Sequence, residues 1–161
     1  MISSIGDELR ISPLRYEFPR ETSGDDANWI VVRGEVRLAQ GRSWSFDNPC
    51  METMDLPKVE QWLRGVADGT VGPRGWDHYS EDDPIHPVLD FLEPNLAFRL
   101  AERAGERCVV EVAFFLESHP ERSRDERFHL RLDMAIQEVE RAADEWHQER
   151  EAFPPRGLYR G

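Results

Sequence analysis

The clearest pattern in the sequence is an alternation of apolar and polar residues from Asn28 to Leu38, in which one side is apolar throughout. A period of two predicts a strand that packs one face on a core. A tight turn and a second run from Ser43 to Asp47 complete a predicted β-hairpin, and we expect Pro49 to end its second strand. An earlier run from Leu9 to Phe18 alternates around Pro13, which predicts an edge strand that is bent or bulged there.

Two segments repeat apolar residues at helical spacing. The first predicts a helix from about Asp55 to Ala67, with Asp55 as the N-cap and Pro57 in the first turn. The second predicts a long amphipathic helix from about Asp133 to Glu151. Its apolar stripe consists of Ile136, Val139, Ala143, Trp146 and Phe153. Its other face is acidic, because the segment has seven acidic and two basic residues.

A second group of short strands lies between the two helices. The predicted strands are Val88–Leu92, Leu96–Ala101, Cys108–Leu116 and Arg127–Leu132. The sequence therefore predicts an α+β fold with a twisted, mainly antiparallel β-sheet of about six or seven strands and two helices packed on it. We expect one domain over residues 1–161, with a core from about 8 to 156 and short disordered ends.

Composition supports one packed core and limits the choice of partner. The chain has 161 residues, five Trp and eight Phe, enough for one core without disulfides or metal. A net charge of −12 disfavours nucleic acid and anionic membranes and favours a cationic protein partner. The sequence lacks a signal-like start and a membrane-spanning apolar run, so we expect a cytoplasmic protein. The oligomeric state is left open.

No motif for catalysis or cofactor binding is found, and we predict no enzyme activity and no cofactor. Cys50 and Cys108 form no C-x-x-C pair and are expected to be buried. His78 stands among acidic residues, but no second His lies at ligand spacing, so we predict a solvated loop without metal. Glu93 or Glu117 as a general acid stays open, since only geometry identifies a working pair of carboxylates.

The other histidines give no stronger sign of chemistry. His86, His119 and His129 lie beside prolines or in strands without a paired carboxylate motif, and His147 is expected to point into solvent.

The longest irregular segment lies between Asp68 and Pro87, and the loop from Gly69 to Pro87 is the predicted recognition element. It is rich in Gly and Pro and contains Trp76, which is either a binding anchor or a plug under its own loop. Together with the acidic face of the second helix, this segment provides the predicted partner-binding residues. They are Trp76, Asp77, Tyr79, Glu81, Asp82, Asp83, Glu140 and Asp144.

Five strings, taken in order over roughly residues 16 to 156, resemble the WapI family of bacterial immunity proteins. They are Asn28–Val36, Trp44–Thr53, Trp62-Leu63, Phe91–Phe98 and Phe115–Pro120. Met51 stands where leucine is expected, and the segment from Gly69 to Pro87 matches nothing in the family pattern. No catalytic residue carries over from the family.

The residues within these strings have structural explanations, so we assign them to the scaffold. They are Trp29, Gly34, Trp44, Asp47, Pro49, Cys50, Glu93, Pro94 and Asn95. The resemblance implies a non-catalytic protein-binding module that neutralises a cognate secreted toxin, with a cationic nuclease as one candidate. The alternative is a small-molecule-binding protein or small enzyme with a pocket between sheet and helices.

Overall fold

The computed structural model describes residues 1, 5–77, 88–121 and 126–157. In these ranges the chain forms seven strands, two α-helices and two short 3₁₀ helices, which confirms the predicted α+β class. The strands are divided between two antiparallel sheets, one of three strands and one of four.

The first sheet has the order β1-β2-β3. Its strands are β1 (Glu8–Tyr16), β2 (Trp29–Arg37) and β3 (Ser43–Glu52). The pairing of β1 with β2 shifts register between Pro13 and Arg15, so the predicted bulge is confirmed. Proline has no N–H to give to the ladder, and an edge strand tolerates this loss.

The prediction that Pro49 ends the hairpin strand is wrong. Pro49 lies opposite Val31, and β3 continues to Glu52. The register of β2 and β3 shifts between Ile30 and Val31, so the ladder is bulged next to the proline. Because β3 is the last strand in the order β1-β2-β3, the missing N–H of Pro49 does not interrupt the interior of the sheet.

The second sheet has the order β4-β5-β6-β7, with every neighbouring pair antiparallel. Its strands are β4 (Val88–Asp90), β5 (Leu96–Ala104), β6 (Arg107–Phe114) and β7 (Phe128–Ala135). The inner face carries apolar side chains such as Leu100, Val110 and Leu132, which are completely buried. A 3₁₀ helix, η2 (Leu116–Ser118), follows β6, and another, η1 (Asp25–Asn28), precedes β2.

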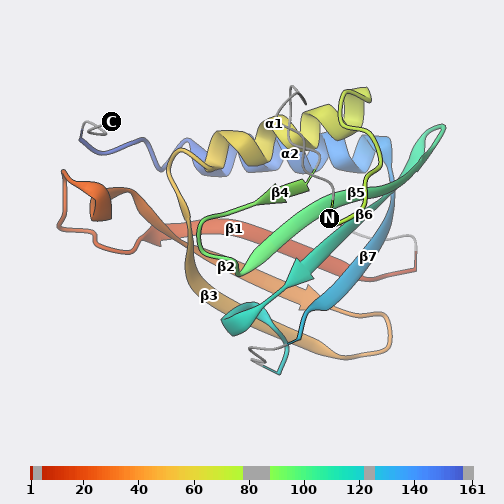
Figure 1. Cartoon of the computed structure of the whole chain (residues 1–161), viewed down its shortest axis with the longest axis horizontal. Helices are drawn as coiled ribbons and strands as arrows, with labels where there is room; N and C mark the ends of the chain where they lie inside the picture. Colours follow the sequence, from red (N-terminus) through yellow and green to blue (C-terminus); the bar gives the residue numbers. More distant parts are fainter. Residues whose placement is uncertain (2–4, 78–87, 122–125, 158–161) are drawn as a thin grey trace.

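The helices α1 (Leu56–Asp68) and α2 (Ile136–Arg150) lie side by side across one side of the two sheets (Figure 1). The indole N–H of Trp146 donates to the backbone carbonyl of Leu56 at 2.8 Å and so joins the two helices. The second helix begins three residues later than predicted, because residues 133–135 still pair with β6 as the end of β7.

One hydrophobic core joins both sheets and both helices. The predicted stripe of α2 is buried at Ile136, Val139, Ala143 and Trp146, and the partly buried Phe153 packs against the same core. Cys50 and Cys108 are free thiols and buried, as predicted.

Asp55 precedes α1 as predicted, but its side chain does not bond to the N–H groups of the first turn. It accepts instead from the backbone N–H of Glu52 at 2.9 Å and pairs with Lys58 at 2.8 Å. The carboxylate therefore fixes the connection from β3 into α1.

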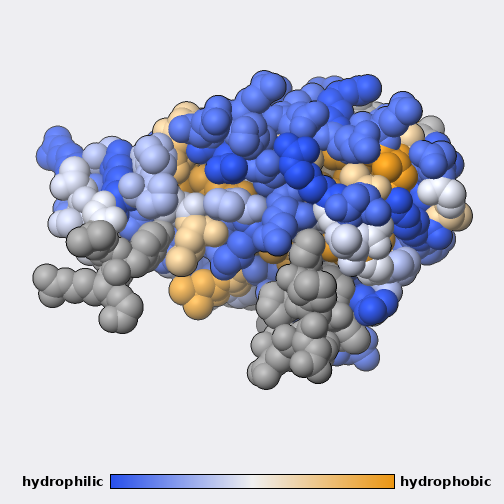
Figure 2. Space-filling model, turned by 90° about the horizontal axis from the view of Figure 1, so that it is seen from above, coloured by the Kyte–Doolittle hydropathy of each residue, from blue (hydrophilic) through white to orange (hydrophobic). Residues whose placement is uncertain are grey.

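The face formed by the helices is mainly hydrophilic, with small hydrophobic patches between the hydrophilic residues (Figure 2). In the described ranges, neither helix is long and apolar enough to cross a membrane.

Candidate protein-interaction surface

The segment after α1 is fastened to the edge of β5. Gly69 ends the helix with a φ of 89°, a left-handed conformation that suits glycine, and its N–H donates to Gly65 at 3.0 Å. Further on, the N–H of Arg74 donates to the carbonyl of Leu100 at 3.0 Å, and the Arg99 guanidinium donates to the Arg74 carbonyl at 2.6 Å. These bonds bring Trp76 onto the face of the second sheet that points away from the core.

A buried carboxylate, Glu111, lies at the centre of this outer face. It pairs with Arg99 at 2.5 Å, with His129 at 2.9 Å and with Arg131 at 3.2 Å. Burial alone would raise the pKa of Glu111, but the hydrogen bond from Trp76 and the positive charges of Arg99 and His129 together hold that pKa below its ordinary value. We call these five residues the Glu111 cluster.

Trp76 belongs to the Glu111 cluster through three contacts. Its indole N–H donates to Oε1 of Glu111 at 3.1 Å, and its ring meets the His129 ring edge-on at a centroid distance of 5.3 Å. The Arg99 guanidinium carbon lies 5.2 Å from the ring centroid, within range of a cation–π contact. The side chain is half-buried. Trp76 is therefore held rigidly on the sheet while part of its ring still faces solvent.

Sequence reasoning did not single out Glu111, although a signal was present. Glu111 is the one charged residue in the otherwise apolar run from Cys108 to Leu116. A lone acid inside a strand needs partners on the neighbouring strands, and here Arg99 lies directly opposite on β5 and Arg131 on β7.

The other predicted residues of the recognition segment are only partly described. Asp77 is exposed next to Trp76. Tyr79, Glu81, Asp82 and Asp83 lie outside the described residues, as do His78 and His86.

The predicted acidic residues of α2 are exposed, and one of them contacts α1. Glu140 and Asp144 both face solvent, and Asp144 pairs with Arg64 of α1 at 3.0 Å. Glu149 pairs with Arg10 of β1 at 3.4 Å, and burial raises its pKa. Ion pairs from the acidic face of α2 therefore link this helix to α1 and β1.

His147 does not simply point into solvent as predicted. Its Nδ1 lies 3.0 Å from Glu60 of α1, which also accepts from Arg150 at 2.6 Å and from Arg64 at 2.9 Å. Burial opposes the ionised form of Glu60, but these hydrogen bonds lower its pKa to about 2.

The remaining described histidines also have defined surroundings. His129 pairs with the carboxylate of Glu111, a contact that its sequence neighbours did not reveal. His119 is buried, and its Nδ1 accepts from the N–H of Glu121 at 3.1 Å. Within the described ranges, no group of three or more His, Cys, Asp or Glu side chains could hold a metal ion.

The resembling strings contribute contacts that hold the sheets together. A Cβ at Gly34 would lie 2.1 Å from the Phe46 ring, so glycine lets that ring cross β2. Arg33 and Asp47 form a two-point ion pair at 2.8 and 2.7 Å across β2 and β3. Burial raises the pKa of the Cys50 thiol to about 12, which is unsuited to a nucleophile at neutral pH.

Residues from three of the strings surround η2. The indole N–H of Trp44 donates to the Ser118 carbonyl at 3.1 Å. The carbonyl of Asn95 accepts from the Phe115 N–H at 3.0 Å and from the hydroxyl of Ser118. The turn with Glu93 and Pro94 is thereby bonded to η2, and both Glu93 and Glu117 line one small cavity.

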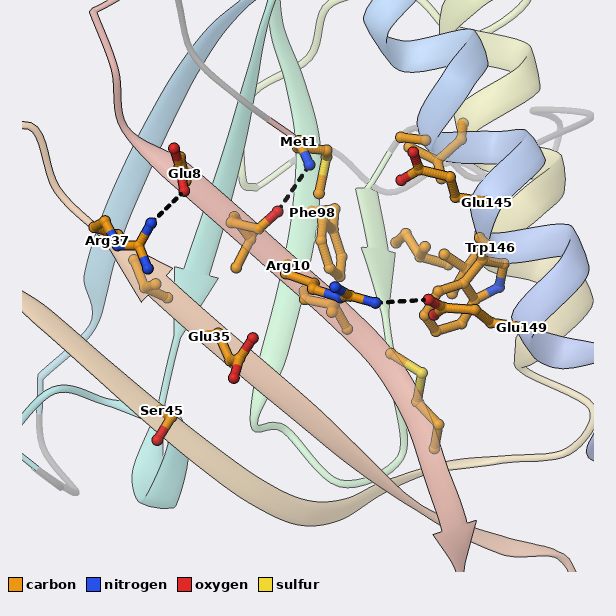
Figure 3. Close-up of a pocket in the computed structure, with 18 of the residues that line it drawn as sticks. Met1, Glu8, Arg10, Glu35, Arg37, Ser45, Phe98, Glu145, Trp146 and Glu149 are labelled. Atoms are coloured by element: carbon orange, nitrogen blue, oxygen red, sulfur yellow. Dashed lines mark hydrogen bonds and ion pairs between the residues drawn. The ribbon is translucent and has the colours of Figure 1, made fainter.

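A larger cavity of about 910 Å³ opens between β1, β5 and the helices (Figure 3). Its deep wall includes Phe98 and Trp146. Two ion pairs lie nearer the opening, Glu8 with Arg37 at 3.0 Å and Arg10 with Glu149 at 3.4 Å. Glu35 and Glu145 also line the cavity and form no ion pair with a described residue. The cavity thus has an apolar interior and both paired and unpaired charged residues around its opening.

Comparison with known proteins identifies a family. No curated protein and no solved structure matches the chain. The model of the immunity protein WapI-like family matches residues 1–154, which confirms the resemblance found in the sequence. The chain is thus a member of the WapI-like immunity protein family.

Proposed function

We propose that this protein neutralises a cognate secreted bacterial toxin by binding its toxic domain in the cytoplasm, without catalysis. Membership in the WapI-like immunity family over residues 1–154 is the observation that carries the proposal. The net charge of −12 supports a toxin with a cationic surface, such as the active site of a nuclease. Binding there would compete electrostatically with a nucleic-acid substrate.

The proposed contact surface comprises Trp76 and the acidic residues that follow it, together with Glu140 and Asp144 on α2. Support comes from the Glu111 cluster, which fixes the half-exposed indole of Trp76 on a rigid sheet. An aromatic side chain that is already immobilised loses little entropy on binding, which is typical of an interface hot spot. The exposed Asp77, Glu140 and Asp144 supply negative charge.

The experiment starts with the gene next to this one, where a large secreted protein with a variable C-terminal domain is expected. That domain, made with its activity blocked by mutation, is mixed with the purified protein, and the dissociation constant is measured by calorimetry. Co-expression with the active domain should restore growth. If a correctly folded protein neither binds nor protects, the proposal is wrong.

The 910 Å³ cavity supports a second candidate function, the binding of a small molecule between sheet and helices. Native mass spectrometry distinguishes the two candidates. Under the leading proposal, the purified protein has the mass of the polypeptide alone. A bound molecule of constant mass would favour the second function.

A further inference from the structure

A second cavity, of about 540 Å³, has an unbalanced set of charges. Four of the residues that line it are acidic, and none is a Lys, Arg or His. The four are Glu17, Asp26, Glu93 and Glu117. None of them forms an ion pair with a described residue. Other carboxylates, among them Asp47, Glu60 and Glu111, do have cationic partners.

The acidic cavity gathers segments that are far apart in sequence. Glu17 follows β1, Asp26 belongs to η1, Glu93 lies in the turn between β4 and β5, and Glu117 lies in η2. Trp29 and Pro49 also line the cavity. Figure 1 shows the end of β3, the turn before β5 and η2 on the same side of the molecule.

An unsatisfied hydrogen-bond acceptor lies in the same wall. Asn95 lines the cavity with only 5% of its surface exposed, and its Oδ1 is buried without a hydrogen-bond partner among the described residues. Leaving a buried acceptor unpaired costs roughly 1 to 3 kcal/mol. Because this oxygen has almost no contact with solvent, the cavity wall must shift slightly before an N–H or O–H donor in the cavity reaches the oxygen and recovers this cost.

The electrostatics of Glu17 agree with this description. Its pKa is raised, first by burial and then by the negative charges of Asp26 and Glu93, against an opposing effect of Arg15. The neighbouring carboxylates therefore repel one another in the absence of a cation.

The geometry is unsuited to a single metal ion. Among the described residues, no three acidic side chains are close enough to hold one. An arginine side chain fits better, because its guanidinium offers five N–H donors over a wide plane and can also stack on an aromatic ring such as Trp29. The exposed Phe18 in the wall and Leu92 beside Glu93, 40% and 78% exposed, offer apolar contacts to the surrounding protein surface.

We propose that the acidic cavity lined by Glu17, Asp26, Glu93 and Glu117 receives an arginine side chain of a basic protein partner. The inference rests on the proposed function for the identity of that partner, the toxin, but its chemistry comes from the cavity itself. Carboxylates would neutralise the guanidinium, Asn95 Oδ1 would accept one of its N–H groups, and Trp29 would cover its face.

The first test uses a short probe and does not depend on the toxin. Isotope-labelled protein is titrated with the capped peptide Gly-Arg-Gly and, separately, with Gly-citrulline-Gly, which has the same shape without the charge. The indole N–H resonance of Trp29, assigned with a Trp29→Phe variant, is followed by NMR. We expect it to shift with the arginine peptide and to stay unchanged with the citrulline peptide.

Charge removal provides the matched comparison. Glu93 and Glu117 are exposed, so Glu93→Gln with Glu117→Gln should fold normally and weaken the arginine peptide about tenfold or more. The control, Glu102→Gln with Glu106→Gln, removes two exposed charges near the other end of β5 and should leave the affinity unchanged. Equal binding of both peptides, or equal affinity of both double variants, would overturn the inference.

The toxin separates this inference from the proposed function. If the parent protein binds the toxin and the Glu93→Gln, Glu117→Gln variant binds equally well, the acidic cavity is not the arginine site, and the proposed function stands. If the arginine peptide binds as expected while the toxin does not bind the parent, the proposed function fails, and the cavity serves another basic protein.

Discussion

Among the described carboxylates of the second sheet, that of Glu111 is the most deeply buried. Two arginines, a histidine and an indole N–H compensate it, and together they immobilise Trp76. The same contacts therefore stabilise the sheet and prepare the proposed anchor for binding. An effect on the stability of the fold and an effect on partner binding can be separated by choosing which residue of the Glu111 cluster is substituted.

Glu111→Gln should destabilise the fold by about 2 to 3 kcal/mol, because the substitution leaves the partly buried Arg99 without its counter-charge. The loss is at the lower end for a buried pair, since Arg131 reaches solvent. Urea denaturation followed by fluorescence measures it. Glu102→Gln removes the exposed partner of Arg131 and should cost less than about 1 kcal/mol. Equal effects of both substitutions would contradict the importance of burial.

At the scale of residues, the sequence predicted whether a side chain is buried better than it predicted which residue that side chain contacts. Cys50, Cys108 and the stripe of α2 are buried as expected, because apolar periodicity reports burial directly. The partners of His129 and His147 were missed, because Glu111 and Glu60 are 18 and 87 residues away from them in the chain. Pairing across such distances depends on strand register and helix docking.

At the scale of elements, the two helices behave as one unit. Trp146 fills the space between them and bonds to the Leu56 carbonyl, while Glu60 gathers His147, Arg150 and Arg64 at its carboxylate. An apolar contact and a charged contact thus join α1 to α2, and they respond to different conditions.

Trp146→Ala should lower the free energy of unfolding by about 3 to 5 kcal/mol, since it leaves a large cavity under α2. Trp146→Phe keeps most of the volume but loses the bond to Leu56 and should cost about 1 to 2 kcal/mol. Thermal and urea denaturation of both variants give these values. A neutral alanine variant would show that the helix does not contribute to the folded core.

The contact at Glu60 predicts a pH dependence. Its pKa is about 2 in the folded protein against an ordinary 4.5, so the unfolded chain takes up the proton first as pH falls. The contribution of Glu60 is therefore complete above about pH 4.5 and is lost as pH falls towards 2.

Comparison of the parent with Glu60→Gln isolates this contribution. The difference in stability should be constant near neutral pH and should shrink between pH 4.5 and 2, as measured by urea denaturation at each pH. Glu140→Gln, at an exposed position of α2, serves as the control. A difference that stays constant down to pH 2 would contradict the role of the carboxylate.

Most elements could be predicted, and the errors have local causes. Pro49 is a reliable strand terminator inside a sheet, but the sequence does not show that β3 lies at an edge. Residues 133–135 are followed by a helix in the sequence, but they pair with β6 in the structure. This pairing makes them the end of a strand. Asp55 was correctly placed before α1, yet its carboxylate bonds to Glu52, because β3 brings that N–H within reach.

At the scale of the whole molecule, the fold brings distant strings together in a way that the sequence does not reveal. The strings that contain Pro49, Asn95 and Glu117 meet at the acidic cavity, although each string has an explanation in local backbone structure. The division of seven strands into two sheets was also outside sequence reasoning, since periodicity predicts strands but not their neighbours. The cavity residues Glu17 and Asp26 were missed for the same reason.

The net charge of −12 acts over the whole surface and so should govern the rate of encounter with a cationic toxin. Raising the salt concentration from 0.05 to 0.5 M should slow association about tenfold or more.

Asp82→Asn with Asp83→Asn should slow association at low salt, whereas Trp76→Ala should mainly speed dissociation, by about thirtyfold if the indole is a hot spot. Surface plasmon resonance with the inactivated toxin domain measures both rates. Trp76→Phe is the control that keeps the ring but removes its bond to Glu111, and it should fall between the parent and the alanine variant. If the alanine and asparagine variants are folded and bind like the parent, the interface lies elsewhere, and the acidic cavity becomes the first place to look for it.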